Sequence, residues 1–170
     1  MKTIKRMFLV FSILFSCVGC DQVTKDIARQ SLAGHGKVSL LGDTLRLTYT
    51  ENPGAFLSLG AHIPDHYRYL VFTCLVGLFL AGLFIYLLKS RQLNNSTAFA
   101  LSLILGGGIG NLIDRILHHG RVIDFLNLGV GSFRTGIFNV ADIAITAGVL
   151  WLAWLSLRSG RRSGESMTRH

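Results

Sequence analysis

The chain has 170 residues, of which 50% are hydrophobic and only 15% are charged, and its formal net charge is +8. A soluble domain of this size usually carries about 25% charged residues, so the composition excludes an ordinary soluble globule and predicts a small polytopic membrane protein. Three cysteines, an odd number within apolar segments, exclude a disulfide framework, and the single CxxC at Cys17 and Cys20 lacks the further ligands of a metal or redox site.

The first apolar run, residues 7–19, follows three cationic residues and precedes Cys20. Such a run is shorter than the ~20 residues that span a bilayer, and it also fits a secretory or lipoprotein signal sequence that is removed after synthesis. Apolar residues nevertheless continue at Val23, Ile27 and Ala28, so a helix can extend past the run. We therefore favour a retained first transmembrane helix over about residues 7–30 and keep a cleaved signal as the alternative.

Residues 34–65 are too polar for the bilayer core. Apolar and polar residues alternate at 38–40 and 45–50, and Gly42-Asp43 between them indicates a hairpin turn. A second turn, Asn52-Pro53-Gly54, precedes the short segment 55–59. We expect a small extracytoplasmic β-sheet over about residues 37–60, lying at the membrane surface.

Three further apolar stretches predict transmembrane helices over about residues 68–88, 97–114 and 138–157. The helix at 97–114 contains the glycine-rich string 106–110, which lacks the preceding strand of a dinucleotide-binding loop and favours close packing of helices in lipid. We expect a loop at 116–136, with strand-like pieces at 122–126 and 130–133, and a basic tail at 158–170. The fold class is therefore a polytopic α-helical membrane protein with four transmembrane helices, formed by residues 1–170 as a single membrane domain.

The charges divide unequally between the two sides of this arrangement. If both termini and residues 89–96 are cytoplasmic, that side holds nine cationic residues against Glu165 alone, and the other side holds eight of each sign. The positive-inside rule favours this orientation, so the net charge requires no nucleic-acid partner. Nearly all acidic residues then lie on the outer side, beyond the reach of cytoplasmic nucleotide cofactors, where chemistry uses only substrate and water.

Asp124 and Asp142 lie at the edges of apolar segments, one on a strand-like piece and the other in the first turns of the last helix. Carboxylates beside a bilayer are costly and often mark functional sites. Two that meet can share one proton, so that the ionised one takes a proton from water while the protonated one polarises a carbonyl. We therefore interpret the pair as a peptidase site without metal or covalent intermediate, and expect the two carboxylates within hydrogen-bond or one-water reach.

Five sequence blocks, in order over nearly the whole chain, resemble the lipoprotein signal peptidase (signal peptidase II) family. They are Asp21–Lys25, Asn52–Phe56, Gly110–Arg115, Val122–Phe125 and Phe138–Asp142. The resemblance implies that Asp124 and Asp142 are the catalytic dyad of a bacterial aspartic endopeptidase. It also implies a set of substrate-binding or site-supporting residues, namely Asp21, Lys25, Asn52, Gly54, Asn111, Asp114, Arg115 and Asn139.

By the same resemblance, the substrate is a prolipoprotein whose signal peptide is cut just before a cysteine that carries diacylglyceryl. The enzyme is expected in the bacterial inner (cytoplasmic) membrane as a multi-pass monomer, with both termini cytoplasmic and the site near the periplasmic face. It is expected to work among membrane lipids without a cofactor or metal, and to be inhibited by cyclic peptides of the globomycin type.

Several alternatives remain open at this point. Asp114 and Arg115 fit a structural ion pair at a helix end as well as they fit substrate contact, and Asn52 and Asn139 also fit turn and helix caps. Intramembrane carboxylates also occur in proton channels and transporters. A chain cleaved before Cys20 and anchored by its own lipid is a further possibility, although it leaves three transmembrane helices unexplained.

Overall fold

The computed structural model describes residues 2–53, 64–90 and 92–167. Within these residues, four helices are long and apolar enough to cross a membrane, and one antiparallel sheet of four strands accompanies them. In chain order the elements are α1 (Lys2–Leu32), β1 (Val38–Leu40), β2 (Leu45–Asn52), α2 (Asp65–Lys89), α3 (Asn95–Leu117), β3 (Val122–Val130), β4 (Phe133–Arg134) and α4 (Val140–Met167). The predicted fold class, four transmembrane helices with a small sheet, is therefore confirmed.

The helices are longer than the apolar runs that predicted them. α1 continues without a break through Cys20 to Leu32, and the chain then turns at Gly34, whose φ of 79° suits glycine. α4 continues to Met167, so most of the expected basic tail extends the last helix. Hydropathy marks only the part of a helix that lies in lipid, so it does not show where a helix continues beyond that part. The chain's two prolines, which would interrupt a helix, are at 53 and 64 and lie outside both extensions.

α3 is the central helix of the bundle. Half of its apolar span is buried inside the protein, against 11–17% for the spans of the other three helices, and α3 packs against each of those helices. Glycines make the α3–α4 packing close on both sides: a Cβ on Gly107 would overlap the carbonyl of Ala141, and one on Gly148 would lie 2.6 Å from the carbonyl oxygen of Ala100. The glycine-rich string thus serves helix packing.

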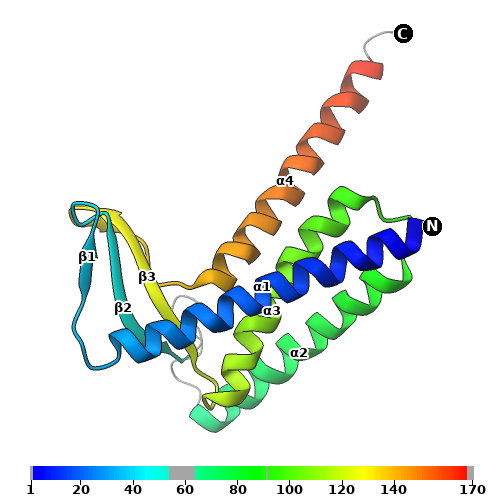
Figure 1. Cartoon of the computed structure of the whole chain (residues 1–170). Helices are drawn as coiled ribbons and strands as arrows, with labels where there is room; N and C mark the ends of the chain where they lie inside the picture. The colour runs from blue at the N-terminus through cyan, green and yellow to red at the C-terminus, as the bar shows by residue number, and fades with distance from the viewer. Residues whose placement is uncertain (1, 54–63, 91, 168–170) are drawn as a thin grey trace.

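The sheet extends from one end of the bundle, and the start of α1 and the end of α4 lie away from it (Figure 1). Its strand order is β1-β2-β3-β4, with antiparallel neighbours. The expected hairpin joins β1 to β2, with positive φ angles at Leu41, Gly42 and Asp43. Phe125 of β3 packs with Ala28 and Leu32 at the end of α1, which holds the sheet against the bundle.

The segment 116–136 differs from the expected loop. Its residues 122–130 form β3, an inner strand that pairs along β2 with Asn52 opposite Val122 and Thr50 opposite Asp124. The sequence showed only strand-like pieces because β3 ends in a glycine-bearing turn and its partner lies about 70 residues earlier, beyond any local pattern. The expected strand at 55–59 and Gly54 lie outside the described residues.

A side chain near the N-terminus fixes the opposite end of the bundle. Arg6 is only 7% exposed, and its guanidinium donates to the carbonyl oxygens of Ser90 and Leu88 at the end of α2. Those carbonyls have no partner within the helix, so Arg6 satisfies them and joins the start of α1 to the end of α2.

The close α3–α4 contact gives a test of the packing. Gly107→Ala should lower the free energy of unfolding by about 1–3 kcal/mol, the usual cost of overpacking a tight interface. Thermal unfolding of the purified protein in detergent measures this change. Gly82→Ala is the matched control, because its Cβ would meet nothing within 4 Å. Equal unfolding temperatures for the two variants would contradict the packing described above.

Candidate active site

Asp124 lies on β3 with only 3% of its surface exposed. Both of its carboxylate oxygens accept hydrogen bonds from asparagine amides. Asn52, the last residue of β2, donates from Nδ2 to Oδ2 at 2.9 Å, and Asn139 donates from Nδ2 to Oδ1 at 2.6 Å. The β2–β3 pairing therefore brings Asn52 of one sequence block into hydrogen-bond contact with Asp124 of another.

Asp142 lies in the first turn of α4 and is held by a reciprocal capping arrangement. The backbone N–H of Asp142 donates to Oδ1 of Asn139 at 3.0 Å, and the backbone N–H of Asn139 donates to Oδ2 of Asp142 at 3.2 Å. The other carboxylate oxygen, Oδ1, accepts from Nδ2 of Asn111 at 2.9 Å. Asn139 is thus the helix cap that the sequence allowed, and it is also a direct partner of Asp124.

One side chain therefore links the two candidate catalytic carboxylates. Asn139 is completely buried. Its amide nitrogen donates a hydrogen bond to the carboxylate of Asp124, and its amide oxygen accepts one from the backbone N–H of Asp142. The same nitrogen lies 3.1 Å from Oδ1 of Asn111. Asp124 and Asp142 thereby share Asn139 as a direct partner, and Asn111, which contacts Asn139, also donates to Asp142.

The surroundings of Asp124 favour its protonated form. Burial and the negative charge of Asp142 raise the pKa of this carboxyl, the hydrogen bonds from Asn52 and Asn139 act in the opposite direction, and the net result is a pKa of about 6. A carboxyl with a pKa near neutrality can hold or release a proton under physiological conditions. The pair can therefore supply one acid and one base.

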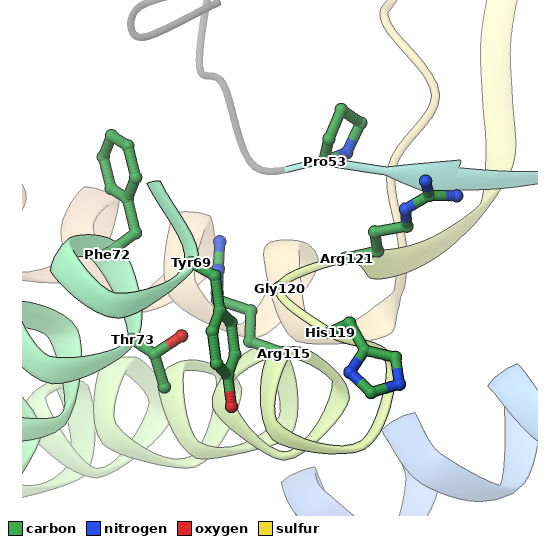
Figure 2. Close-up of a pocket in the computed structure, with 8 residues that line it drawn as sticks. All are labelled: Pro53, Tyr69, Phe72, Thr73, Arg115, His119, Gly120 and Arg121. Carbon is green, nitrogen blue, oxygen red and sulfur yellow. The ribbon is translucent and has the colours of Figure 1, made fainter. Parts of the chain in front are cut away.

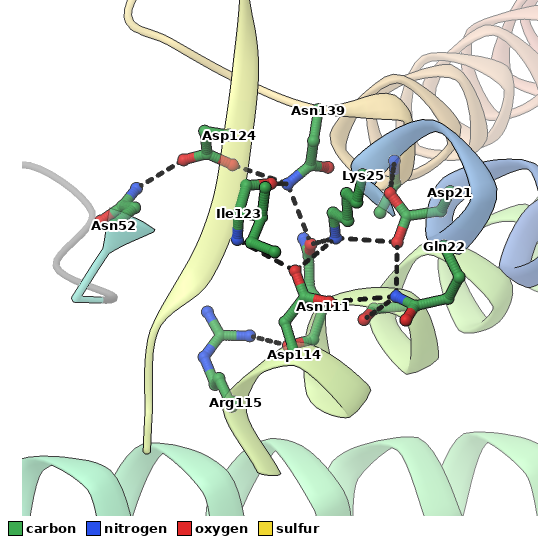
Figure 3. Close-up of polar contacts among 12 residues, drawn as sticks. Asp21, Gln22, Lys25, Asn52, Asn111, Asp114, Arg115, Ile123, Asp124 and Asn139 are labelled. Atoms are coloured by element: carbon green, nitrogen blue, oxygen red, sulfur yellow. Dashed lines mark hydrogen bonds and ion pairs between the residues drawn. The ribbon is translucent and has the colours of Figure 1, made fainter. Parts of the chain in front are cut away.

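A second polar cluster, which we call the lysine cluster, lies beside the pair and consists of Asp21, Gln22, Lys25, Asn111 and Asp114 (Figure 3). Lys25 is 2% exposed. Its ammonium contacts Oδ2 of Asp21 at 2.7 Å, Oδ2 of Asp114 at 2.8 Å and Oδ1 of Asn111 at 3.0 Å. Three acceptors therefore surround the three ammonium protons.

The two carboxylates of the lysine cluster also reach the backbones that carry the catalytic candidates. Asp21 Oδ1 accepts from the N–H of Ala141, the residue before Asp142, at 2.9 Å. Asp114 Oδ2 accepts from the N–H of Ile123, the residue before Asp124, at 3.0 Å. The lysine cluster therefore positions both candidate catalytic residues through the backbone.

The structure assigns different partners to Asp114 and Arg115 from those that the sequence suggested. Asp114 forms its ion pair with Lys25, not with its neighbour Arg115. Arg115 donates from Nη1 to the carbonyl oxygen of Asn111 at 3.2 Å and lies close enough to Asp142, Asp114 and Asp124 to feel their charges. Its guanidinium therefore faces the site while Asp114 belongs to the lysine cluster.

Gln22 is a site residue that sequence reasoning missed. Its amide donates to the carbonyl oxygen of Gly110 at 3.2 Å and to Asp114 Oδ1 at 3.0 Å, joining α1 to α3. The only sequence signal was its place inside the block Asp21–Lys25, because a partly buried glutamine carries no other mark. In the described part of the chain, no three His, Cys, Asp or Glu side chains are grouped as metal ligands.

Comparison with known proteins gives concordant matches. The model of the family described as Signal peptidase (SPase) II matches residues 13–158. The lipoprotein signal peptidase of Sphingopyxis alaskensis is 36% identical over 98% of this chain and 96% of its own length, and that of Syntrophus aciditrophicus is 40% identical over 78% and 81%. Two solved structures, both described as a bacterial membrane enzyme structure by the in meso method, are each 28% identical to this chain. The first has a TM-score of 0.72 and the match covers 89% of this chain and 88% of that one. The second has a TM-score of 0.71 and the match covers 87% of this chain and 92% of that one.

The lysine cluster can be tested by removing its cation. Lys25→Met leaves two buried carboxylates without their counter-charge, so it should lower the free energy of unfolding by about 3–5 kcal/mol. Arg29→Met, an exposed cation one turn later on α1, is the control and should change stability by no more than about 0.5 kcal/mol. Thermal unfolding in detergent measures both, and indistinguishable values would contradict the positioning role of Lys25.

Proposed function

The chain belongs to the signal peptidase II family, and on this premise we propose that Asp124 and Asp142 are the catalytic pair of an intramembrane aspartic endopeptidase that removes signal peptides from prolipoproteins. The observation that carries the proposal is the link through Asn139, which hydrogen-bonds Asp124 with its amide nitrogen and the backbone of Asp142 with its amide oxygen. Membership of this family also disfavours the two alternatives, a proton channel and a cleaved lipoprotein.

The mechanism follows from two carboxyl groups that share one proton. The ionised carboxylate takes a proton from a water molecule, whose oxygen attacks the scissile carbonyl carbon, while the protonated carboxyl donates to the carbonyl oxygen. When the tetrahedral intermediate collapses, the C–N bond breaks and the leaving amine receives a proton from the pair. Asn52, Asn111 and Asn139 hold the four carboxylate oxygens throughout, so the pair stays aligned during this exchange.

The remaining residues of the family motifs support this pair. Arg115 faces Asp124 and Asp142, which suits a group that hydrogen-bonds substrate carbonyls. Asp21, Lys25 and Asp114 position the backbones before the catalytic residues. Gly54, beyond the described residues, remains a proposed substrate-binding position by its match to the family motif.

We propose that the substrate is cut just before a cysteine that carries a diacylglyceryl group. Signal peptides are apolar helices, so the enzyme must present its site to them from within the membrane. Four spans provide lipid-facing surface. Asp142 lies in the first turn of α4 and Asp124 lies on β3, and the start of α4 lies at the end of the helices nearest the sheet (Figure 1). The site is therefore at the depth where such a segment would leave the bilayer.

The same reasoning extends to location and partners. The charge distribution supports a bacterial inner membrane protein with cytoplasmic termini and a site near the periplasmic face, and the start of α1 and the end of α4 lie away from the sheet (Figure 1). We propose that residues 1–170 act as a single membrane domain and as a monomer among membrane lipids. Cyclic peptides of the globomycin type are the proposed inhibitors, by resemblance to the family.

Replacing either catalytic carboxyl by an amide tests the central assignment. Asp124→Asn and Asp142→Asn should each reduce cleavage at least ~10²-fold, the lower bound for loss of a general acid or base, while folding and membrane insertion persist. The measurement is cleavage of a synthetic diacylglyceryl prolipoprotein peptide by the purified protein. Asp26→Asn, an exposed carboxylate on α1, should retain full activity; full activity in either catalytic variant would exclude the pair.

The pH dependence follows from the raised pKa of Asp124. The pair is active with one proton bound, so kcat/KM should fall on the alkaline side as that proton is lost. The apparent pKa of this alkaline limb belongs to the pair and not to either residue alone. Asn52 stabilises the ionised form of Asp124 by donating to it. Asn52→Ala should therefore raise the pKa and move the alkaline limb to higher pH.

A matched asparagine on the same sheet provides the control for this shift. Asn127 on β3 contacts Thr135 and Arg134 and not the catalytic pair. Asn127→Ala should leave both limbs of the pH profile in place even if it lowers stability. An alkaline limb that stays fixed, or moves to lower pH, in Asn52→Ala would contradict the role of Asn52.

A further inference from the structure

A cavity of about 170 Å³ lies between the start of α2, the end of α3 and the beginning of β3 (Figure 2). We call it the α2–α3 cavity. Its lining residues are Pro53, Tyr69, Phe72, Thr73, Arg115, His119, Gly120 and Arg121. It adjoins the catalytic pair, because Pro53 follows Asn52, the partner of Asp124, and because Arg115 lies in the field of both catalytic carboxylates.

Two hydrogen-bonding atoms in the wall of this cavity are buried without partners. Thr73 Oγ1, from α2, and Arg115 Nε, from α3, both have less than 1 Å² of exposed surface and no hydrogen-bond partner among the residues that the structure describes. A buried polar group without a partner costs about 1–3 kcal/mol. Two such atoms on residues that line one cavity beside the proposed catalytic site point to a ligand that carries acceptor oxygens and reaches them as the cavity wall adjusts.

The charges around the cavity favour a neutral ligand over an anion. Arg115 is already surrounded by the carboxylates of Asp142, Asp114 and Asp124, and Arg121 pairs with Glu51 at 3.2 Å. A phosphate or carboxylate would have to approach these acidic groups closely. A carbonyl oxygen accepts the same hydrogen bonds without that repulsion.

The depth of the cavity narrows the choice of carbonyl. The apolar span of α2 begins at Tyr69, so Thr73 lies about one turn, roughly 6 Å along the helix, from the polar end of that span. The neighbouring α2 side chains Leu70, Val71 and Leu75 are 45–60% exposed and face outward as lipid-contacting groups do. The ester carbonyls of a glycerolipid lie at the boundary between headgroups and hydrocarbon, so they can approach this end of α2.

We propose that Thr73 Oγ1 and Arg115 Nε bind ester carbonyl oxygens of the diacylglyceryl group on the substrate cysteine. This inference rests on the proposed function and adds to it the subsite that distinguishes lipidated from unlipidated substrate. The cavity is smaller than the roughly 300–1,000 Å³ of a pocket for a whole ligand, which suits a glyceryl ester whose acyl chains remain in the membrane. Thr73 is thereby a specificity-determining residue outside the catalytic pair.

The test compares two synthetic peptide substrates that differ only in the lipid linkage. One carries two ester-linked acyl chains on the glyceryl group of the cysteine, and the other carries two ether-linked alkyl chains of equal length, which lack the carbonyl oxygens. The wild-type enzyme should cleave the ester substrate with the higher kcat/KM. Thr73→Val, which keeps the shape and removes the hydroxyl, should reduce this preference about three- to tenfold, mainly through KM, as expected for the loss of one hydrogen bond.

Two further variants make the result specific to the hydroxyl. Thr73→Ser retains the donor and should keep the ester preference, and Thr146→Val, at an exposed threonine of α4, should not alter it. An equal loss of kcat/KM on both substrates in Thr73→Val would overturn the subsite, as would a wild-type enzyme that does not distinguish ester from ether.

The outcomes also separate this inference from the proposed function. If the wild-type enzyme cleaves both substrates equally and Asp124→Asn cleaves neither, the peptidase assignment stands and the ester subsite is wrong. If Asp124→Asn cleaves both as the wild type does, the catalytic assignment itself fails. An ester preference that only Thr73→Val weakens supports both.

Discussion

The structure depends on one buried ammonium group. Lys25 brings a positive charge into the membrane-embedded part of the protein, where an unpaired charge would cost several kcal/mol, and it meets Asp21 and Asp114 at 2.7 and 2.8 Å. Because those carboxylates also accept from the N–H groups of Ala141 and Ile123, the same charge cluster fixes the start of α4 and the start of β3. The two elements that carry the proposed catalytic pair are thus positioned by one charge cluster.

The proposed catalytic pair is held by hydrogen bonds from neutral amides, and the guanidinium of Arg115 lies close enough to feel its charges. Amides from three asparagines contact Asp124 and Asp142, whereas the one lysine nearby is directed to two other carboxylates. Nearby cations favour the ionised form of a carboxyl, and the charge of Lys25 acts in this direction on Asp124. Neutral donors align the carboxylates while burial keeps the pKa of Asp124 high. The two adjacent aspartate pairs therefore differ in their direct partners, which are Lys25 for Asp21 and Asp114 and asparagine amides for Asp124 and Asp142.

The sequence predicted what depends on local composition. Hydropathy located all four spans, and alternation with a Gly-Asp turn located the β1–β2 hairpin. Local composition could not predict β3 as an inner strand, because the pairing of β3 with β2 joins residues about 70 positions apart. Local sequence likewise left open an ion pair between Asp114 and adjacent Arg115, whereas Asp114 pairs with Lys25 from another helix. The unpartnered atoms of Thr73 and Arg115 depend on three-dimensional packing and leave no sequence pattern.

The glycine-rich string of α3 shows how closely packing and site are connected. At Gly107 the missing side chain admits the backbone of α4, but at Gly110 it admits the lysine cluster: a Cβ there would lie 2.5 Å from Oδ2 of Asp21, the oxygen that contacts Lys25. The carbonyl of Gly110 also accepts from Gln22. Any side chain at position 110 would displace Asp21 and, through the N–H of Ala141, the first turn of α4. Small residues in this helix therefore allow close approach in lipid and, one turn later, leave room for the charges that position the catalytic residues.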